Sequence, residues 1–319
     1  MKIHVMDTTL RDGEQTSGVS FTPREKLSIA GLLLEELQLN RIEVASARVS
    51  RGEFDGAKMI FDWARENGYL DRVEVLGFVD GRESLDWIAK AGGEVINLLT
   101  KGSLKHCQYQ LRKSPEEHIA DIIGVVKKAD EMGIRVNIYF EDSSNGMRNS
   151  PEYVYHMIDR LKETSIDRYM LPDTLGILNQ QETYRFCRDI RTRYPDLNFD
   201  FHAHNDYDLA TANVYEAIRA GIDGVHTTVN GLGERAGNVP LSSVIGIVED
   251  HVKGEMDLNV KKLYRVSKLI ESFSGIRIPA NKPLIGENVF TQTSGIHADG
   301  DQKDNLYFND LLPERFGRK

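Results

Sequence analysis

Short runs of apolar, β-favouring residues alternate along this chain with longer segments in which apolar residues recur at helical spacing. The segment after Ser114 shows the helical pattern, with Ile119, Ile122, Ile123 and Val126 on one face. Regular alternation of this kind predicts parallel strands joined by helices. We expect eight strands, over residues 3–8, 41–46, 73–79, 95–101, 136–142, 168–174, 198–205 and 224–230.

Two helix starts are marked by their capping residues. Thr22-Pro23-Arg24-Glu25 and Ser114-Pro115-Glu116-Glu117 each place a hydroxyl N-cap, a proline at the first helical position and a glutamate at the third. In such a capping box the hydroxyl and the glutamate satisfy backbone N–H groups reciprocally. We therefore expect helices to begin at Pro23 and Pro115.

The number of strand and helix units decides the fold class. Eight β/α units favour an α/β fold of the closed (β/α)8 TIM-barrel type, which needs about 250 residues. An open sheet that binds a dinucleotide is disfavoured, because no glycine fingerprint follows the first strand. We expect a catalytic barrel over residues 1–256 and a helix plus linker extension over residues 257–319.

Composition excludes several classes of protein. Forty Lys and Arg against 49 Asp and Glu give a net charge of −9, so the basic surface of a nucleic-acid binder is not expected. Cys107 and Cys187 lie far apart, which indicates neither a disulfide framework nor a thiolate zinc site. With no export signal or long apolar run, we expect a cytoplasmic protein that does not bind membranes.

Polar residues at the ends of the predicted strands indicate a metal site. His202 and His204 lie two apart, so an extended chain directs both imidazoles to one side. Asp12 and Asn238 follow other strands and could supply oxygen ligands at the same rim. Two nitrogens with oxygens suit a divalent ion such as Mg, Mn or Zn. The alternative is that one histidine is simply a hydrogen-bonded core residue.

Two further features have both a functional and a plain interpretation. Arg11 precedes Asp12 and could direct its guanidinium at a ligand oxygen on the metal, or it could form an ordinary ion pair in an exposed loop. The stretch 230–238 contains three glycines and could approach a phosphate group closely, or it could be only a loop.

Three long strings resemble one family of enzymes. Residues 7–15 (DTTLRDGEQ), 202–206 (HAHND) and 230–238 (NGLGERAGN) are similar to the acyltransferases that make 2-isopropylmalate, homocitrate and citramalate, and the resemblance spans nearly the whole chain. Residues 45–50, 98–103, 171–176 and 312–319 make the spirochaete-type citramalate synthases the most similar group. Such members continue into a C-terminal regulatory domain, which we expect to be absent from residues 1–319.

The resemblance implies a Claisen-type condensation of acetyl-CoA with pyruvate, giving (R)-citramalate and CoA for isoleucine biosynthesis. One alternative is 2-isopropylmalate synthase, which uses 2-oxoisovalerate in leucine biosynthesis. Another is a metal-dependent aldolase or lyase of the same barrel superfamily, which would act without CoA. A regulatory barrel without catalysis is disfavoured, because every expected ligand residue is present.

The resemblance also assigns roles to residues of this chain. It implies a divalent metal, acetyl-CoA as cosubstrate and a homodimer in which a histidine of the extension enters the neighbouring active site. Without the family, that histidine would be a surface residue in a polar linker. The implied residues are Asp12, His202, His204 and Asn238 on the metal, Arg11 on the keto oxygen, Thr174 on the substrate carboxylate, Glu141 and His297 as acid/base groups, and Leu76, Leu99 and Tyr139 around the substrate side chain.

Overall fold

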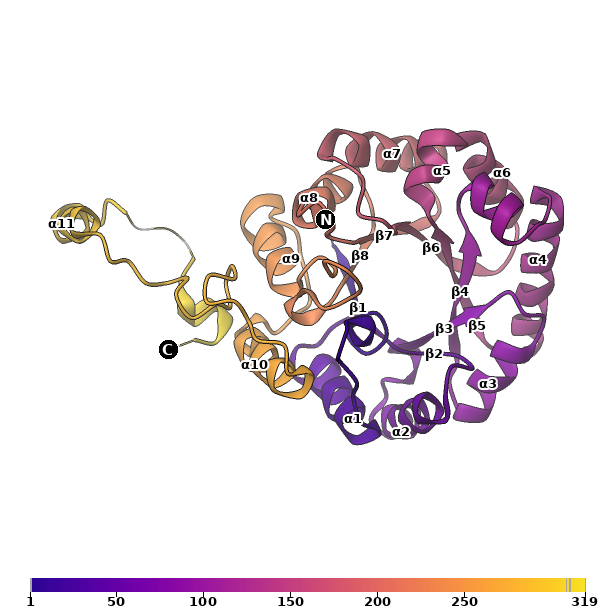
Figure 1. Ribbon diagram of the computed structural model, residues 1–319, viewed down its shortest axis with the longest axis horizontal. Helices are drawn as coiled ribbons and strands as arrows, with labels where there is room; N and C mark the ends of the chain where they lie inside the picture. The colour runs from indigo at the N-terminus through magenta and orange to yellow at the C-terminus, as the bar shows by residue number, and fades with distance from the viewer. Residues whose placement is uncertain (1, 308, 310, 319) are drawn as a thin grey trace.

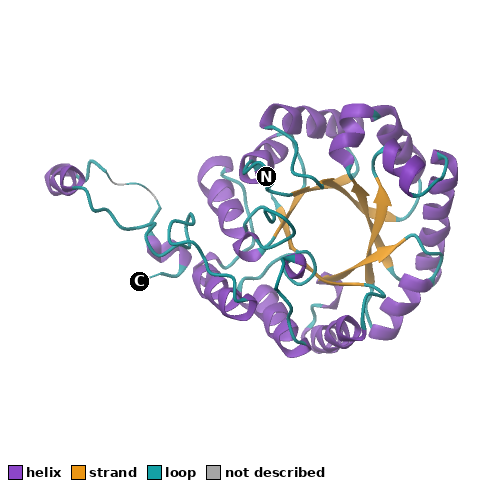
Figure 2. Cartoon of the chain, in the orientation of Figure 1, coloured by secondary structure: helices purple, strands orange, loops and turns teal. Residues whose placement is uncertain are grey.

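Eight parallel strands close into a barrel in the computed structural model, which describes residues 2–307, 309 and 311–318. Each strand pairs with the next, and β8 pairs with β1 (Figures 1 and 2). The predicted (β/α)8 barrel is therefore confirmed. The strands are β1 (His4–Asp7), β2 (Arg41–Ser46), β3 (Val73–Phe78), β4 (Val95–Lys101), β5 (Arg135–Glu141), β6 (Ile166–Asp173), β7 (Asn198–Ala203) and β8 (Gly224–Thr227).

The last two strands are shorter than predicted. β8 ends at Thr227 and is followed by a 3-10 turn over Val229–Gly231, in which Asn230 has a φ of 62°. A strand cannot continue through this left-handed conformation. β7 ends at Ala203, and His204 then forms a single antiparallel bridge with Asn238. Both departures bring polar side chains to the carboxyl-terminal rim of the barrel.

Most of the helices form a ring around the barrel (Figure 1). Both predicted capping boxes are present, with Thr22 and Glu25 at α1 and Ser114 and Glu117 at α4. The helices are α1 (Pro23–Gly31), α2 (Arg51–Asn67), α3 (Glu83–Ala91), α4 (Pro115–Glu131), α5 (Ser143–Asn149), α6 (Pro151–Leu161), α7 (Gln180–Arg193), α8 (Ala210–Arg219), α9 (Leu241–Ile247), α10 (Leu263–Ser274) and α11 (Gly295–Asp304).

Apolar side chains fill both the space between strands and helices and part of the barrel interior. A small cluster of Met6, Leu76, Tyr139 and Met170, with Leu99 against it, lies among the strands. Charged residues lie beside it inside the barrel and neutralise one another. Arg41 pairs with Glu74 (3.0 Å), and Arg168 pairs with Asp200 (2.6 Å). Burial of these charges is tolerated because each has a partner.

After α10 the chain leaves the barrel and then returns to it. α10 packs through Leu263, Val266 and Ile270, all fully buried, in the same core as the barrel. Residues 276–290 stay against the barrel, where Leu284 and Ile285 are buried in the same core, and residues 291–307 then project as an arm that carries α11 (Figure 1). Phe316 is buried again. A division of the chain at residue 256 stays a prediction. Among the described residues, no helix is long and apolar enough to span a membrane.

Candidate active site

The loop after β1 holds two of the predicted site residues in a tight turn. The carbonyl oxygen of Thr8 accepts hydrogen bonds from the backbone N–H groups of Arg11 (3.1 Å), Asp12 (2.8 Å) and Gly13 (3.1 Å). Leu10 is buried beneath this turn. The turn therefore fixes the Arg11 and Asp12 side chains at the rim of the barrel.

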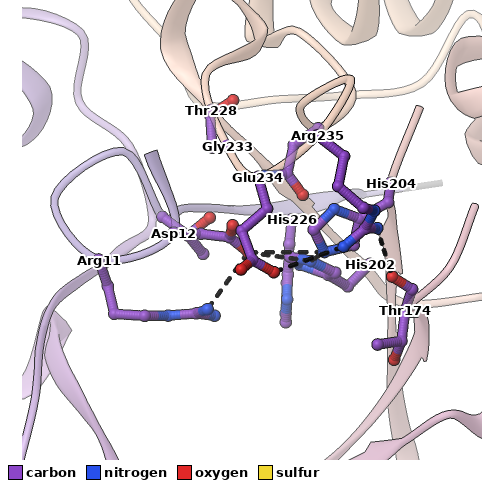
Figure 3. A network of polar contacts seen from close by, with 12 residues as sticks. Arg11, Asp12, Thr174, His202, His204, His226, Thr228, Gly233, Glu234 and Arg235 are labelled. Atoms are coloured by element: carbon purple, nitrogen blue, oxygen red, sulfur yellow. Dashed lines mark hydrogen bonds and ion pairs between the residues drawn. The ribbon is translucent and has the colours of Figure 1, made fainter. Parts of the chain in front are cut away.

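Asp12 meets the two histidines of β7. The Nε2 atoms of His202 and His204 lie 3.3 Å apart, and Asp12 Oδ2 lies 3.3 Å from the first and 3.9 Å from the second (Figure 3). All three side chains are buried. Their ligand atoms lie within 4.8 Å of one another, so the three residues could hold one metal ion.

Asn238 reaches the same place from the loop after β8. Its backbone pairs with that of His204, and its Nδ2 donates to the carbonyl oxygen of Leu232 (3.1 Å). Within the described part of the chain, neither Asn238 Oδ1 nor Asp12 Oδ1 has a hydrogen-bond partner, although both atoms are buried. Buried oxygens without donors suit a cation. The set fits the predicted divalent ion.

Burial and neighbouring charges shift the pKa values of Asp12 and His204 towards the protonation states that bind a metal ion. Burial alone would raise the pKa of Asp12, but Arg11 and the two histidines outweigh it and hold that pKa well below its usual value. Burial, helped by the neighbouring His202, lowers the pKa of His204 to about 4. At neutral pH the site therefore offers an ionised carboxylate and a neutral imidazole, the forms that bind metal.

Arg11 makes contacts that hold its guanidinium in place. Nε donates to Glu43 (2.5 Å), Nη1 to Asp12 (3.2 Å) and Nη2 to the Tyr139 hydroxyl (3.5 Å). These three bonds use three of the five N–H groups. The others remain for a ligand in the pocket. An exposed loop ion pair, the plain interpretation of Arg11, does not describe this buried arrangement.

Thr174, in the loop after β6, and Glu141, at the end of β5, line the same pocket. Thr174 Oγ1 accepts the backbone N–H of Asp142 (2.9 Å), so its own hydrogen is free to be donated elsewhere. Glu141 is paired with Lys101, the last residue of β4. Lys101 thus places a positive charge against the predicted acid/base group.

The pocket above the metal ligands holds about 180 Å³. Leu76, Leu99 and Tyr139 form its apolar wall, as predicted. Arg11, Asp12, Thr174, His202 and His204 form the polar side. The structure therefore brings together in one pocket ten of the predicted positions when Asn238, which lies behind His204, is included.

His297 is the predicted site residue that the fold does not bring to the pocket of its own chain. It lies on α11 of the arm, where its ring stacks on Tyr307 at 4.0 Å between centroids (Figure 1). Ile296 and Leu306, nearby on the arm, are largely exposed. The predicted contribution of His297 to a neighbouring subunit stays a prediction.

Several residues of the site were missed by the sequence analysis. Glu43 holds Arg11, His226 contacts Tyr139 (3.2 Å), and Asp200 contacts His226 (3.3 Å). Lys101 was missed as well. A signal existed, since Glu43, Asp200 and His226 are polar residues inside predicted strands and Lys101 ends one. Their partners could not be identified, because they lie on other segments of the chain.

The fold and the rim geometry define a (β/α)8-barrel protein with a candidate divalent-metal centre at the carboxyl ends of its strands. The chain belongs to the HMGL-like family, whose model matches residues 2–270.

Curated relatives support the resemblance inferred from the motifs. The (R)-citramalate synthase CimA of Methanocaldococcus jannaschii is 33% identical over 100% of this chain and 63% of its own length. A 2-isopropylmalate synthase of the same organism is 33% identical, over 100% and 60%. The homocitrate synthase of Sulfolobus acidocaldarius is 33% identical, over 100% and 67%. The predicted family is therefore confirmed, although these names do not distinguish the substrate.

The chain spans about three fifths of the length of the first curated relatives that it matches. Among solved structures, the HMG-CoA lyase of Bacillus subtilis superposes with a TM-score of 0.75 and 22% identity, covering 87% of this chain and 95% of the lyase. At that identity the likeness supports the barrel fold alone.

Proposed function

We propose that this protein condenses acetyl-CoA with pyruvate to give (R)-citramalate and CoA. One observation carries the proposal: the Arg11 guanidinium and the ligand atoms of Asp12, His202 and His204 face one small pocket that also has an apolar wall. A 2-oxo acid has the matching chemistry, with two adjacent oxygens for the polar side and a short alkyl group for the wall.

Asp12, His202, His204 and Asn238 would hold the metal, which when bound makes the keto carbon of the 2-oxo acid more electrophilic. Arg11 adds a fixed positive fork for the oxygen that gains charge during attack. Thr174, whose hydroxyl hydrogen is free, donates to the substrate carboxylate. These residues orient the 2-oxo acid.

Glu141 is placed to act as the base. It takes a proton from the methyl group of acetyl-CoA, and the resulting enolate carbon attacks the keto carbon, forming the new C–C bond. The keto C=O π bond breaks, and its oxygen takes up a proton from the acid of the pair to become the product hydroxyl. Water then cleaves the thioester, which releases CoA and leaves the new carboxylate. Lys101 forms an ion pair with Glu141 and so places a positive charge beside the base. His297 of a second subunit completes the acid/base pair in a homodimer.

The apolar wall sets the choice of substrate. Leu76 and Tyr139 are nearly fully buried and packed against Met6 and Met170. The close packing resists any outward shift of these side chains that would enlarge the pocket. A methyl group fits beside it, whereas the isopropyl group of 2-oxoisovalerate needs more room. Each added methylene is worth about 1–3 kcal/mol of discrimination in such a pocket.

The experiment is a CoA-thiol release assay with acetyl-CoA, pyruvate and added Mg²⁺ or Mn²⁺. We expect CoA release that requires both pyruvate and metal, and we expect His202→Ala and His204→Ala each to lose bound Mn²⁺. Pyruvate production from citramalate without any CoA requirement would instead assign a lyase. Unchanged metal content in both variants would remove the proposed metal site.

A further inference from the structure

A chain of polar groups runs through the barrel interior beneath the pocket. Asp200 Oδ2 lies 3.3 Å from His226 Nε2, His226 Nδ1 lies 3.2 Å from the Tyr139 hydroxyl, and that hydroxyl lies 3.5 Å from Arg11 Nη2. Asp200, His226 and Tyr139 are almost inaccessible to solvent. These contacts therefore lie in a low-dielectric interior, away from water. In such an interior the donor and acceptor of each hydrogen bond are strongly enforced.

The Asp200 end of this chain is a fixed anion. Arg168 binds both carboxylate oxygens through Nε (3.1 and 3.0 Å), and Arg41 contacts Oδ2. Two guanidinium groups thus contact this buried carboxylate and compensate its negative charge. An ionised carboxylate only accepts hydrogen bonds.

The carboxylate therefore selects one tautomer of His226. Since Asp200 Oδ2 can only accept, Nε2 of His226 must carry the hydrogen. In a neutral ring, Nδ1 is then an acceptor. The one donor within reach of Nδ1 among the described residues is the hydroxyl of Tyr139, which consequently directs its hydrogen into the barrel.

This direction changes what Tyr139 presents to the pocket. The hydroxyl hydrogen of Tyr139 is donated to His226 inside the barrel, so its oxygen is left to accept from Arg11. The guanidinium carbon of Arg11 lies 5.8 Å from the centroid of the Tyr139 ring. Tyr139 also keeps its proton, because burial raises the pKa of its hydroxyl well above the usual value. The wall formed by Tyr139 therefore offers no hydrogen-bond donor to a substrate.

We propose that His226, set in its Nε2–H tautomer by Asp200, is a positioning residue that determines specificity. By withholding the Tyr139 hydrogen from the pocket, it disfavours 2-oxo acids with a second carboxylate, and it leaves the Tyr139 oxygen to orient Arg11. The effect on substrate choice rests on the proposed function, whereas the tautomer of His226 does not depend on it.

Nitrogen NMR of the histidine rings tests the tautomer directly. In ¹⁵N-histidine-labelled protein near neutral pH, we expect His226 to show a protonated Nε2 and an unprotonated Nδ1, with the signal assigned by its loss in His226→Gln. The opposite tautomer, or a doubly protonated ring, would overturn the proposal. No substrate is needed, so this result is independent of whether the condensation takes place.

A double-mutant cycle tests the consequence for substrates. We expect His226→Leu to free the Tyr139 hydrogen, to lower kcat with pyruvate, and to raise kcat/KM for 2-oxoglutarate relative to pyruvate by about tenfold. In a Tyr139→Phe background the same change should leave that ratio unaltered. An equal shift in both backgrounds would show that His226 does not act through Tyr139.

His226→Gln is the conservative control, because its amide can donate to Asp200 and accept from Tyr139 at once. We expect it to retain the substrate ratio of the parent protein. A Gln variant that folds, as judged by its melting temperature, but behaves like His226→Leu would contradict the relay. If the parent protein turned over no 2-oxo acid, the proposed function would fail, and the NMR result would still decide the tautomer.

Discussion

Arg11 could be an exposed ion-pair residue by its sequence alone, but in the structure it is largely buried among fixed partners. It contacts Glu43, Asp12 and Tyr139 at once, on three different segments of the chain. A lysine at this position would keep the positive charge and could still neutralise the two buried carboxylates. It would lose the planar fork that can hold these contacts and a ligand together.

We therefore expect Arg11→Lys to fold normally but to turn over pyruvate about 100-fold more slowly, a loss of roughly 2.7 kcal/mol in transition-state binding. Turnover and melting temperature should be measured together. Arg193→Lys, an exposed substitution on α7, is the matched control and should change neither. Near-normal turnover of Arg11→Lys would remove Arg11 from the mechanism.

Asp7 carries a charge that costs stability. Burial raises its pKa to about 6, although Thr9 and Thr227 donate to the carboxylate. Between about pH 4 and 6 the folded state therefore holds a proton that the unfolded state has released. The contribution of Asp7 to the free energy of unfolding accordingly falls as pH rises through this range, by about 3 kcal/mol at most.

Asp7→Asn should remove that fall. We expect the variant to gain stability relative to the wild type as pH rises from 4 to 7, measured by urea unfolding at each pH. The exposed Asp196→Asn is the control and should parallel the wild type. A constant difference between Asp7→Asn and the wild type across the pH range would show that Asp7 does not titrate as proposed.

At this scale the sequence revealed only part of the site. His202 and His204 could be predicted as a pair because residues two apart in one strand share a side. Asp200 lies in the same strand and was missed, since its role depends on Arg41, Arg168 and His226, which come from three other strands. Contacts across a closed barrel depend on strand register, which local pattern does not give.

Among the structural elements, the loop after β8 has the closest packing at the site. Gly233 has a φ of +147°, and a Cβ there would lie 2.3 Å from Asn238 Nδ2 and 3.3 Å from Asp12 Oδ1. A Cβ on Gly237 would lie 2.0 Å from the Gly231 carbonyl oxygen. These glycines therefore serve close packing behind Asp12 and Asn238, whereas the sequence alone also allowed a close approach to a phosphate group.

Gly233→Ala should displace Asn238 and weaken Mn²⁺ binding by about tenfold, as loss of a supporting contact does at metal sites. Isothermal titration calorimetry measures the affinity. Gly18→Ala is the matched control, because Gly18 also has a positive φ (+84°) but no described atom within 4 Å of the added Cβ. Equal affinity in the two variants would mean that this loop does not support the metal site.

Helix starts were predicted better than strand ends. Both capping boxes are present because they depend only on residues three apart in the chain. The ends of β7 and β8 were placed too late, because the polar continuation of each strand turns at the rim to form the site. The errors in strand ends thus occur at the rim, where the chain turns to form the pocket and the local sequence pattern no longer indicates the structure.

At the scale of the whole molecule, the projecting arm is the feature that bears on how the active site is completed. Residues 291–307 project from the barrel, and α11 carries His297 away from the pocket of its own chain (Figure 1). In a homodimer with exchanged arms, each active site would combine Arg11 of one subunit with His297 of the other. The barrel was predictable from the sequence, but the path of the arm was not, since few apolar residues direct its packing.

Mixing two inactive variants tests that arrangement. His297→Ala and Arg11→Lys should each be nearly inactive alone, while dimers that exchange subunits contain one intact site. We expect a mixture, after reversible dissociation, to recover about a quarter of the wild-type turnover. Mixing His297→Ala with itself is the control. Failure to recover activity, with subunit exchange demonstrated, would argue against a shared active site.

The central claim concerns the fit of pyruvate to the pocket of Arg11, the metal ligands and the apolar wall. The measurement is kcat/KM for CoA release with acetyl-CoA, Mn²⁺ and each of pyruvate, 2-oxobutyrate, 2-oxoisovalerate and 2-oxoglutarate. We expect pyruvate to exceed 2-oxobutyrate by about tenfold, and the two larger acids by more. Preference for 2-oxoisovalerate would contradict the proposed substrate, and no CoA release with any acid would contradict the condensation itself.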